Sequence, residues 1–391
     1  MDVCTTLDQS ARAVAVALAY LRLVGIEWSP HPTEDEVRRE YEQIWSLLGS
    51  RKIEDVVDSP LMSDLGSLGT LDVLTKAVPP AMFTDRNLCA LIICRAVNFS
   101  LERGNCDASC VAYVNLGRIA GPLFGDYQAA FRFGQVGYEL VERRGLKRFQ
   151  ASIYLYFSNF TARWMKHVRF AQELLRRAFE AGNRIGDLTL AAYAALCQVS
   201  NLLFAGDSLS EVERAGEFSL AFAQKAKFGL IVDAMNTQLA VVRTLRGSTL
   251  KFGSFDSQEI EELAFERHLA SNPNHAITEC WYWVRKLQAR YLAGDYEVAL
   301  EASSRAQQLL WTAFHFFEEA EFHFYSALSR AACCDGAPED ERQRHLESLA
   351  AHRRQLAVWT ENCADNFESR LALVSAEIAR IEGRELDAEQ S

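Results

Sequence analysis

Residues 188–204 have the sequence LTLAAYAALCQVSNLLF, and this stretch decides the fold class of the chain. Leu188, Ala191, Ala195 and Val199 recur at intervals of three and four, so they lie on one face of an α-helix. The preceding stretch repeats this spacing with Phe170, Leu174, Leu175, Ala178 and Phe179. Short β-branched runs lie inside longer helical patterns, and the sequence therefore predicts an all-α fold.

The glycines that end predicted helices recur with a period. Gly125, Gly206, Gly294 and Gly383 are 81, 88 and 89 positions apart (206 − 125, 294 − 206 and 383 − 294), and weaker breaks divide each gap. Half a gap is about 40–45 residues, the length of one long helix pair. We therefore expect an α-solenoid, a right-handed superhelix of tetratricopeptide-like helix pairs with a concave face. The alternative is an irregular helical bundle.

Local signals place the ends of these helices. In Gly294-Asp295-Tyr296 and Gly125-Asp126-Tyr127, glycine is expected to end one helix and aspartate to cap the next. Three pairs match the capping-box spacing: Thr33 with Glu36, Ser210 with Glu213, and Asp365 with Glu368.

The 391 residues exceed the roughly 250–300 at which a single core stops growing, so the chain forms several domains or an elongated array. Only 8 prolines occur and no Pro-rich or Gly/Ser-rich linker is present, which favours one continuous array. Gly66, Gly69, Pro79 and Pro80 interrupt the pattern near the N-terminus. We therefore assign residues 1–80 to an atypical N-terminal helical cap or junction, and residues 81–391 to the repeat array.

Composition excludes several classes of partner. The net charge of −11 argues against a general nucleic-acid binder. A local basic cluster remains, formed by Arg143, Arg144, Lys147 and Arg148, and its simplest interpretation is a solvated helix end.

The 10 cysteines are irregularly spaced, which indicates reduced thiols in a cytoplasmic protein. The apolar run at residues 11–25 is too short and too charged to span a membrane.

No catalytic motif is present. The phosphate-binding loop, the protein-kinase set and the nucleophile elbow are all missing, so we expect no catalytic residue and no cofactor. No metal site is expected either, because four convergent ligands are not apparent. His345 and His352 lie on one face of a predicted helix and are interpreted as exposed polar histidines. Asn105 and Asp107 are interpreted as a cap at a tight interhelix turn.

An aromatic and basic cluster near the C-terminal half carries the site hypothesis. Aromatic rings beside arginine suit the recognition of a peptide or a flat anion on a concave face. The competing interpretation is that these rings fill the gap between neighbouring helix pairs. The hypothesis names six residues: Trp281, Arg285, Gln288, Arg290, Tyr291 and His323.

Ten strings spread along the chain carry a family resemblance. They are His31-Pro32, Phe83-Thr84-Asp85, Gly104-Asn105-Cys106-Asp107-Ala108-Ser109, Phe124-Gly125-Asp126-Tyr127, the run from Trp281 to Arg290, Trp359, Glu361-Asn362-Cys363, Asn366-Phe367, the run from Ala376 to Arg380, and Gly383-Arg384. Together they resemble the tetratricopeptide-like region of large bacterial hybrid signalling proteins. In that family, a serine/threonine kinase-like domain and an AAA-type ATPase precede this region, and a GAF domain and a sensor histidine kinase follow it.

The resemblance implies a sensory and regulatory segment whose partners include the flanking kinase and ATPase domains. No catalytic residue carries over, because those motifs belong to segments outside this chain. The family pattern continues past residues 383–388 into another helix, whereas this chain stops at Ser391. We therefore expect a piece of a longer protein, with a stand-alone relative as the alternative.

Three functions compete at this stage. The leading hypothesis is a non-catalytic scaffold of a bacterial signal-transduction kinase that binds a protein, a peptide or a small ligand. The second is a structural spacer between ATPase and kinase domains without a ligand. The third is an unrecognised enzyme, which needs a pocket where a base, a nucleophile and an orienting group converge.

Overall fold

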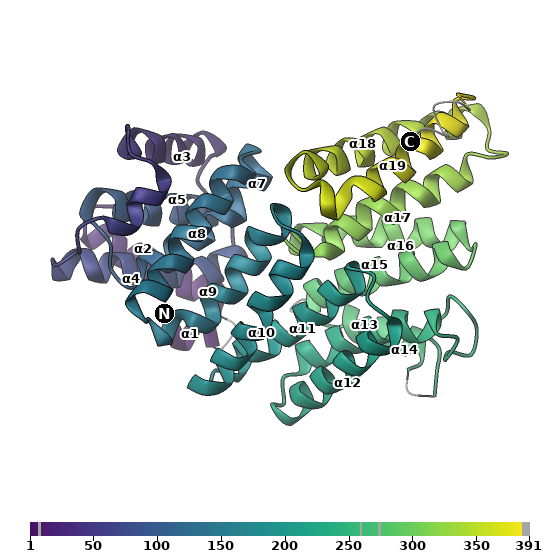
Figure 1. Ribbon diagram of the computed structural model, residues 1–391, viewed down its shortest axis with the longest axis horizontal. Coiled ribbons are helices and arrows are strands. Elements are labelled where there is room, and N and C mark those ends of the chain that lie inside the picture. The colour runs from purple at the N-terminus through teal and green to yellow at the C-terminus, as the bar shows by residue number, and fades with distance from the viewer. Residues whose placement is uncertain (7–8, 259, 273–274, 385–391) are drawn as a thin grey trace. The chain divides into compact units, whose positions relative to one another are not determined.

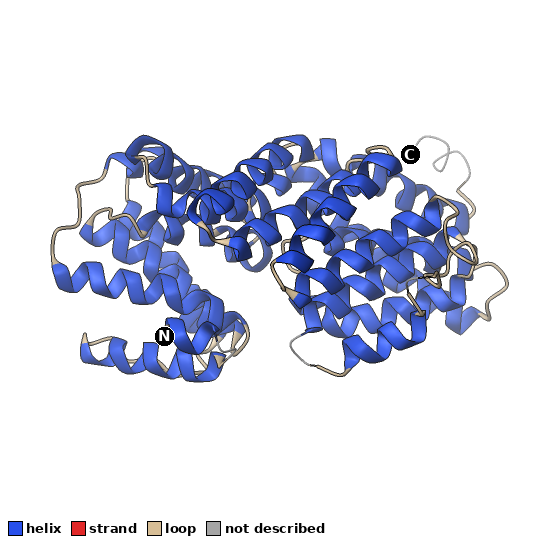
Figure 2. Ribbon diagram, turned by 90° about the horizontal axis from the view of Figure 1, so that it is seen from below, coloured by secondary structure: helices blue, strands red, loops and turns tan. Residues whose placement is uncertain are grey.

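The computed structural model describes residues 1–6, 9–258, 260–272 and 275–384, and every regular element within them is a helix (Figure 2). The one extended pairing in these ranges is a single parallel bridge between Leu61 and Asn105. The predicted all-α class is confirmed, and the stacked helices are consistent with a helical-repeat protein or α-solenoid. In the same ranges, no helix combines the length and the apolarity needed to cross a lipid bilayer.

The chain divides into two compact units, Met1–Thr161 and Ala162–Ser391, called unit 1 and unit 2 below. In unit 1, α4 packs on α2 and α5, and α8 packs on α6, α7 and α9. The helices of unit 1 are α1 (Asp2–Thr6), α2 (Ser10–Leu23), α3 (Glu34–Leu48), the 3₁₀-helix η1 (Ile53–Asp58), α4 (Leu65–Met82), α5 (Arg86–Arg103), α6 (Ser109–Asn115), α7 (Gly117–Phe124), α8 (Tyr127–Arg144) and α9 (Lys147–Phe160).

The prolines expected to break the pattern in unit 1 do not end their helix at once. Pro79 and Pro80 lie in the last turn of α4, which continues to Met82. Neither proline has a backbone N–H, so the two hydrogen bonds that these positions would donate to the carbonyls of Thr75 and Lys76 are missing. The predicted division at residues 80 and 81 thus falls inside α4. The assignment of residues 1–80 to a terminal cap stays a prediction.

Unit 2 shows the contact pattern of a stacked array (Figure 1). Each helix contacts the next along the chain in the pairs α10–α11, α12–α13, α15–α16 and α17–α18, and α11, α13, α15, α17 and α19 also contact one another in succession. The helices are η2 (Ala162–Trp164), α10 (Val168–Ile185), α11 (Leu188–Phe204), α12 (Leu209–Lys225), α13 (Gly229–Leu245), α14 (Glu262–Ala270), α15 (Ala276–Leu292), α16 (Tyr296–Leu309), η4 (Leu310–Thr312), α17 (Phe317–Cys333), α18 (Glu339–Asn362) and α19 (Ala364–Ile381).

The sequence explains why alternate helices of unit 2 form an inner layer. Helix α11 has the bounds that its apolar pattern predicted, and its buried residues, from Ala191 to Phe204, lie on most of its faces. Helix α10 buries a single stripe that includes Ala171, Leu174 and Ala178 and leaves its charged face exposed. A helix that is apolar on most sides must be enclosed, whereas a one-sided helix can cover it.

Glycines end most helices as predicted. Gly125 and Gly145 are left-handed C-caps with φ of 71° and 61°, and Gly206, Gly294 and Gly383 adopt positive φ one residue after the cap. Left-handed φ is strained for residues with a Cβ atom, which is why glycine serves there.

One predicted capping box is confirmed and two are wrong. The Thr33 hydroxyl accepts a hydrogen bond from the backbone N–H of Glu36, whose carboxylate accepts from the backbone N–H of Thr33. Helix α12 instead begins at Leu209, so Ser208 rather than Ser210 precedes it. Helix α19 begins at Ala364, which places Asp365 inside the first turn.

Candidate functional site

The structure buries three of the six residues predicted to recognise a ligand and leaves the other three, Arg290, Tyr291 and His323, half-buried. Five of the six lie on α15 and the sixth, His323, lies on α17. Trp281, Arg285 and Gln288 are only 2%, 1% and 6% exposed, because α15 packs against α13, α14, α16 and α17. Trp281 meets Phe316 edge to face, with ring centres 5.1 Å apart. These side chains therefore face the interior of unit 2 rather than an open groove.

Arg285 belongs to a buried polar network that joins four inner helices. Ser200 on α11, Gln238 on α13, Arg285 on α15 and Glu318 on α17 each contribute one side chain. Nη2 of Arg285 donates to Oε1 of Glu318 at 2.7 Å, and Nε donates to Oε1 of Gln238 at 2.9 Å. The same Glu318 oxygen accepts from Ser200 at 2.6 Å and from Gln238 at 2.9 Å. The network therefore links all four of these helices through one buried carboxylate oxygen.

A further nitrogen of Arg285, Nη1, connects the network to Gln288 on the same helix. Nη1 donates to Oε1 of Gln288 at 3.1 Å, and Nε2 of Gln288 donates to the hydroxyl of Tyr325 at 3.2 Å. The ring of Tyr325 lies 5.7 Å from that of Tyr291, which is half-buried. The structure thus brings Arg285, Gln288 and Tyr291 into one chain of contacts.

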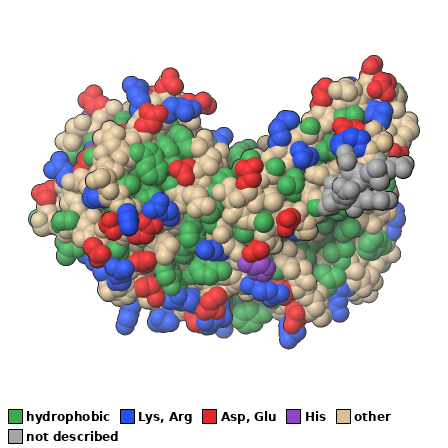
Figure 3. All heavy atoms as spheres, turned by 45° about the horizontal axis from the view of Figure 1, so that its top comes forward, with side chains coloured by type: hydrophobic (Ala, Val, Ile, Leu, Met, Phe, Trp, Pro, Cys, Tyr) green, Lys and Arg blue, Asp and Glu red, His purple; other side chains and the backbone are tan. Residues whose placement is uncertain are grey.

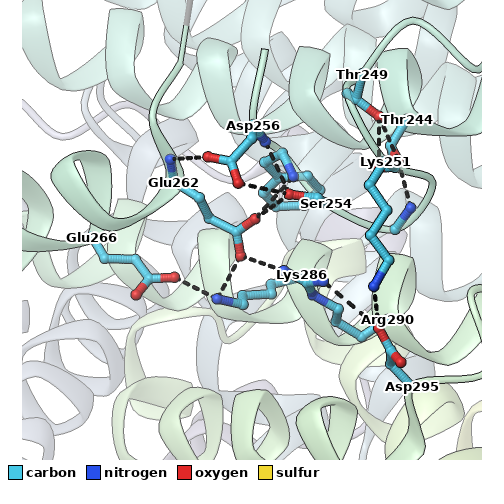
Figure 4. Close-up of polar contacts among 12 residues, drawn as sticks. Thr244, Thr249, Lys251, Ser254, Asp256, Glu262, Glu266, Lys286, Arg290 and Asp295 are labelled. Carbon is cyan, nitrogen blue, oxygen red and sulfur yellow. Dashed lines mark hydrogen bonds and ion pairs between the residues drawn. The ribbon is translucent and has the colours of Figure 1, made fainter.

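Arg290 lies in a second cluster, which fastens the segment before α14 onto α15 (Figure 4). Oε1 of Glu262 accepts from Arg290 at 2.7 Å and from Lys286 at 2.6 Å, while its Oε2 accepts from Ser254 and from the backbone N–H of Phe255, both at 3.0 Å. Burial acts to raise the pKa of Glu262, but the hydrogen bonds from Lys286, Phe255 and Arg290 prevail and lower it to about 2. Arg290 is therefore already engaged as an internal cation.

His323 pairs with one of the histidines that were expected to be exposed. Nδ1 of His323 lies 3.0 Å from Nδ1 of His352, and the two rings pack with Trp359 and Phe322. His345 and His352 are only 7% and 6% exposed, so the prediction of exposed histidines is wrong. The reason is that their face of α18 packs on α17.

Burial makes this histidine pair sensitive to acid. Desolvation, followed by repulsion from His352, lowers the pKa of His323 to about 3, and desolvation followed by repulsion from Arg330 lowers that of His352 to about 4. Between pH 6.5 and pH 4 the unfolded histidines bind protons that the folded ones refuse, so stability falls as the pH falls. We expect a loss of about 1–2 kcal/mol per histidine between pH 7 and pH 5, measured by urea unfolding. His352→Gln should remove the contribution of His352, about 1–2 kcal/mol of this dependence. An unchanged dependence in this variant would contradict the assignment.

An accessible pocket lies in unit 1 instead. It has a volume of about 440 Å³ and is formed where the chain before α4, the turn before α6 and the α8–α9 junction meet. Small-molecule sites have volumes of about 300–1,000 Å³. Its lining combines apolar and charged side chains: Leu61, Met62, Leu68, Asp72, Asn105, Cys106, Asp107, Ala108, Arg144, Leu146, Lys147, Arg148 and Phe149.

Asn105 lines this pocket, and the preceding Gly104 allows the chain to approach Pro60 closely. Gly104 has φ of 93°, and a Cβ atom there would lie 2.3 Å from the carbonyl oxygen of Pro60, so only glycine fits. Asn105 exchanges backbone hydrogen bonds with Pro60 and Met62, and its side chain donates to the carbonyl of Val56 at 2.7 Å. The prediction that Asn105 caps a helix is therefore wrong, because α6 begins after Ala108 and Asn105 is buried against η1.

Basic side chains dominate the charge of the pocket. Arg144, Lys147 and Arg148 line it against two carboxylates, of which Asp72 pairs with Lys76 at 3.1 Å. Nη1 of Arg144 is shielded from solvent and has no hydrogen-bond partner, although it forms an ion pair with Oδ1 of Asp107 at 3.7 Å. The basic cluster noticed in the sequence thus contributes three of its four members to one concave site.

No protein-family model and no curated protein matches this sequence. The fold places the chain among all-α proteins of stacked helices. The resemblance to bacterial hybrid signalling proteins stays a prediction.

Proposed function

We propose that the chain is a non-catalytic regulatory scaffold, built of tetratricopeptide-like helix pairs in a right-handed superhelix, that binds a small anionic ligand. In this proposal it is a cytoplasmic segment of a bacterial signal-transduction kinase, next to kinase and ATPase domains. The family strings and the contact pattern of unit 2 support the scaffold. The unit 1 pocket supports the ligand.

The observation that carries the proposal is Nη1 of Arg144, which is shielded from solvent and lacks a hydrogen-bond acceptor, beside Lys147 and Arg148. Its ion pair with Asp107, at 3.7 Å, is too long to be a hydrogen bond. A buried guanidinium N–H without an acceptor is costly, and a carboxylate or phosphate group would supply that acceptor. The apolar lining by Met62, Leu68 and Phe149 would receive the rest of the ligand. A folded protein partner would need a larger surface than this pocket offers.

The distribution of surface charge does not favour general nucleic-acid binding. On the face in view in Figure 3, Lys and Arg side chains are interspersed with Asp and Glu rather than gathered into one continuous field. Together with the net charge of −11, this favours a local anion site over a surface that follows a phosphate backbone.

Ligand binding tests the proposal directly. Thermal-shift screening with phosphate, citrate, nucleoside monophosphates and short dicarboxylates should reveal at least one anion that raises the melting temperature, and calorimetry should give its affinity. The variant Arg144→Ala/Lys147→Ala should weaken that affinity about 10–100-fold, because it removes two charge-assisted hydrogen bonds.

A matched control separates this site from general attraction of anions. Arg214→Ala/Lys225→Ala removes two exposed cations on α12 and should leave the affinity unchanged. Equal weakening in both variants would show that net charge, not the pocket, attracts the anion. The absence of any thermal shift across the screen would leave the proposal without support.

A ligand-free spacer is the second candidate function, because one observation favours it. The charged side chains of α15 are engaged internally by Glu318 and Glu262, so unit 2 holds its geometry without a ligand. A spacer predicts no anion binding and no change of melting temperature in the same screen.

A further inference from the structure

Three side chains with metal-binding donor atoms converge in unit 2, at one end of α14. Asp233 on α13, His268 on α14 and His275, the residue before α15, each offer one such atom, and the three atoms lie within 4.8 Å of one another. Nε2 of His268 is 2.8 Å from Oδ2 of Asp233. The rings of His268 and His275 have their centres 5.3 Å apart.

These separations fit a metal ion after small side-chain movements. Donor atoms at about 2.0–2.2 Å from a tetrahedral metal are about 3.3–3.6 Å from one another. The donor atoms of Asp233 and His268 are already closer than that, at 2.8 Å. No two donor atoms of the group are more than 4.8 Å apart, so none of the separations exceeds the range by more than about 1.5 Å. His268 is half-exposed, so an ion can reach the site from solvent.

His275 supplies an independent indication of a ligand. Its Nδ1 is shielded from solvent and has no hydrogen-bond partner, which is unusual for a buried ring nitrogen. Its Nε2 lies 3.4 Å from the side-chain amide of Asn272. With the amide oxygen turned toward Nε2, Asn272 would accept the Nε2 proton and leave Nδ1 as a lone-pair donor, the tautomer that metal binding requires.

We propose that Asp233, His268 and His275 bind one divalent transition-metal ion, and that zinc is its occupant. Two imidazoles and one carboxylate are ligands that zinc accepts in tetrahedral geometry, with water in the fourth position. This site was not predicted from the sequence, because Asp233 lies 35 residues before His268 and the packing of α14 brings the two together.

The metal would complete the attachment of α14. Glu262 at the start of α14 is already held by Lys286 and Arg290 on α15. An ion bound by His268 near the end of α14 would fasten that end to α13 and to the start of α15. This site is separate from the anion pocket of unit 1 and does not depend on it.

Calorimetry on the full chain, purified without a histidine tag and stripped with a chelator, tests the proposal with ZnCl₂. Wild type should bind one zinc ion per chain, and His268→Ala and His275→Ala should each weaken binding at least about tenfold. The matched control is His31→Ala. His31 forms the same kind of contact with Asp85, at 2.9 Å. The His31→Ala variant should therefore bind zinc with the affinity of wild type.

Cobalt(II) distinguishes this site from the cysteines. Co²⁺ bound here should give visible ligand-field absorption without the near-ultraviolet charge-transfer bands of thiolate ligands, and circular dichroism should show that the variants keep their helices. If His275→Ala bound zinc with unchanged affinity, His275 would not be a ligand, and Asp233 and His268 would form an ion pair rather than part of a zinc site. Thiolate bands that persist in His268→Ala, or no binding of zinc at all, would overturn the proposal.

Discussion

Arg285→Met is expected to lower the free energy of unfolding of unit 2 by about 3–5 kcal/mol. Arg285 and Glu318 are 1% and 0% exposed, so the substitution leaves a carboxylate without its cation inside the protein. Ser200 and Gln238 would still donate to that carboxylate, but two neutral hydrogen bonds do not compensate a buried charge. Urea unfolding followed by circular dichroism and tryptophan fluorescence measures the loss.

A double-mutant cycle shows whether the loss comes from the pair. Arg285→Met/Glu318→Gln removes both charges and should be more stable than Arg285→Met alone, because no unpaired charge remains. Arg176→Met is the surface control. Arg176 is more than half exposed in its pairs with Glu173 and Glu180, and its replacement should cost less than about 1 kcal/mol. If Arg285→Met costs no more than this control, the network does not stabilise unit 2.

Periodicity and glycine spacing were sufficient to predict the all-α class and several of the helix ends. The bounds of α11 follow from its apolar pattern, and the glycines at 125, 206, 294 and 383 mark helix ends because only their local backbone conformation matters. The predicted capping box at Ser210 was wrong because another pair with the same spacing, Ser208 and Glu211, lies at the start of α12, where the Ser208 hydroxyl donates to the Glu211 carboxylate at 2.7 Å. The predicted box at Asp365 was wrong because α19 begins at Ala364, where tertiary contacts hold the first turn. The Asn366 side chain binds the backbone of Arg163, Lys166 and Val168.

The site was harder to predict because burial depends on which layer a helix occupies. The pattern of α15 contains arginine and aromatic residues on several faces, which is consistent with either an exposed concave face or an enclosed inner helix. Glu318, the partner of Arg285, lies 33 residues further along the chain, and Ser200 is 118 residues from Glu318. No local pattern reveals that such distant groups satisfy one another. The basic cluster of the unit 1 pocket was visible in the sequence. The concave shape was not, because it arises where residues 60–62, docked on Asn105, meet the α8–α9 junction.

Phe317→Ala is the second substitution expected to destabilise unit 2 strongly, by about 3–5 kcal/mol. Phe317 is fully buried at the start of α17 and stacks on Phe204 of α11, with ring centres 3.7 Å apart. It also packs near Phe367 of α19 and Trp164 of η2, and the guanidinium of Arg163 lies 4.6 Å from its ring centre. Its removal leaves a cavity between the first and the last helices of unit 2 and takes an aromatic face from a buried arginine.

Two further measurements test whether the loss of stability comes from the packing of Phe317 between the helices. Phe218→Ala removes a phenylalanine that is 61% exposed on α12 and should cost less than about 1 kcal/mol in the same urea experiment. Hydrogen exchange should show that Phe317→Ala reduces protection in α11 and α19 as well as in α17, because the ring joins all three helices. If protection were lost only around residue 317, or if both alanine variants were equally stable, the first and last helices of unit 2 would be held together by other contacts, such as those from Arg370 to Glu321 and to the carbonyl of Phe204.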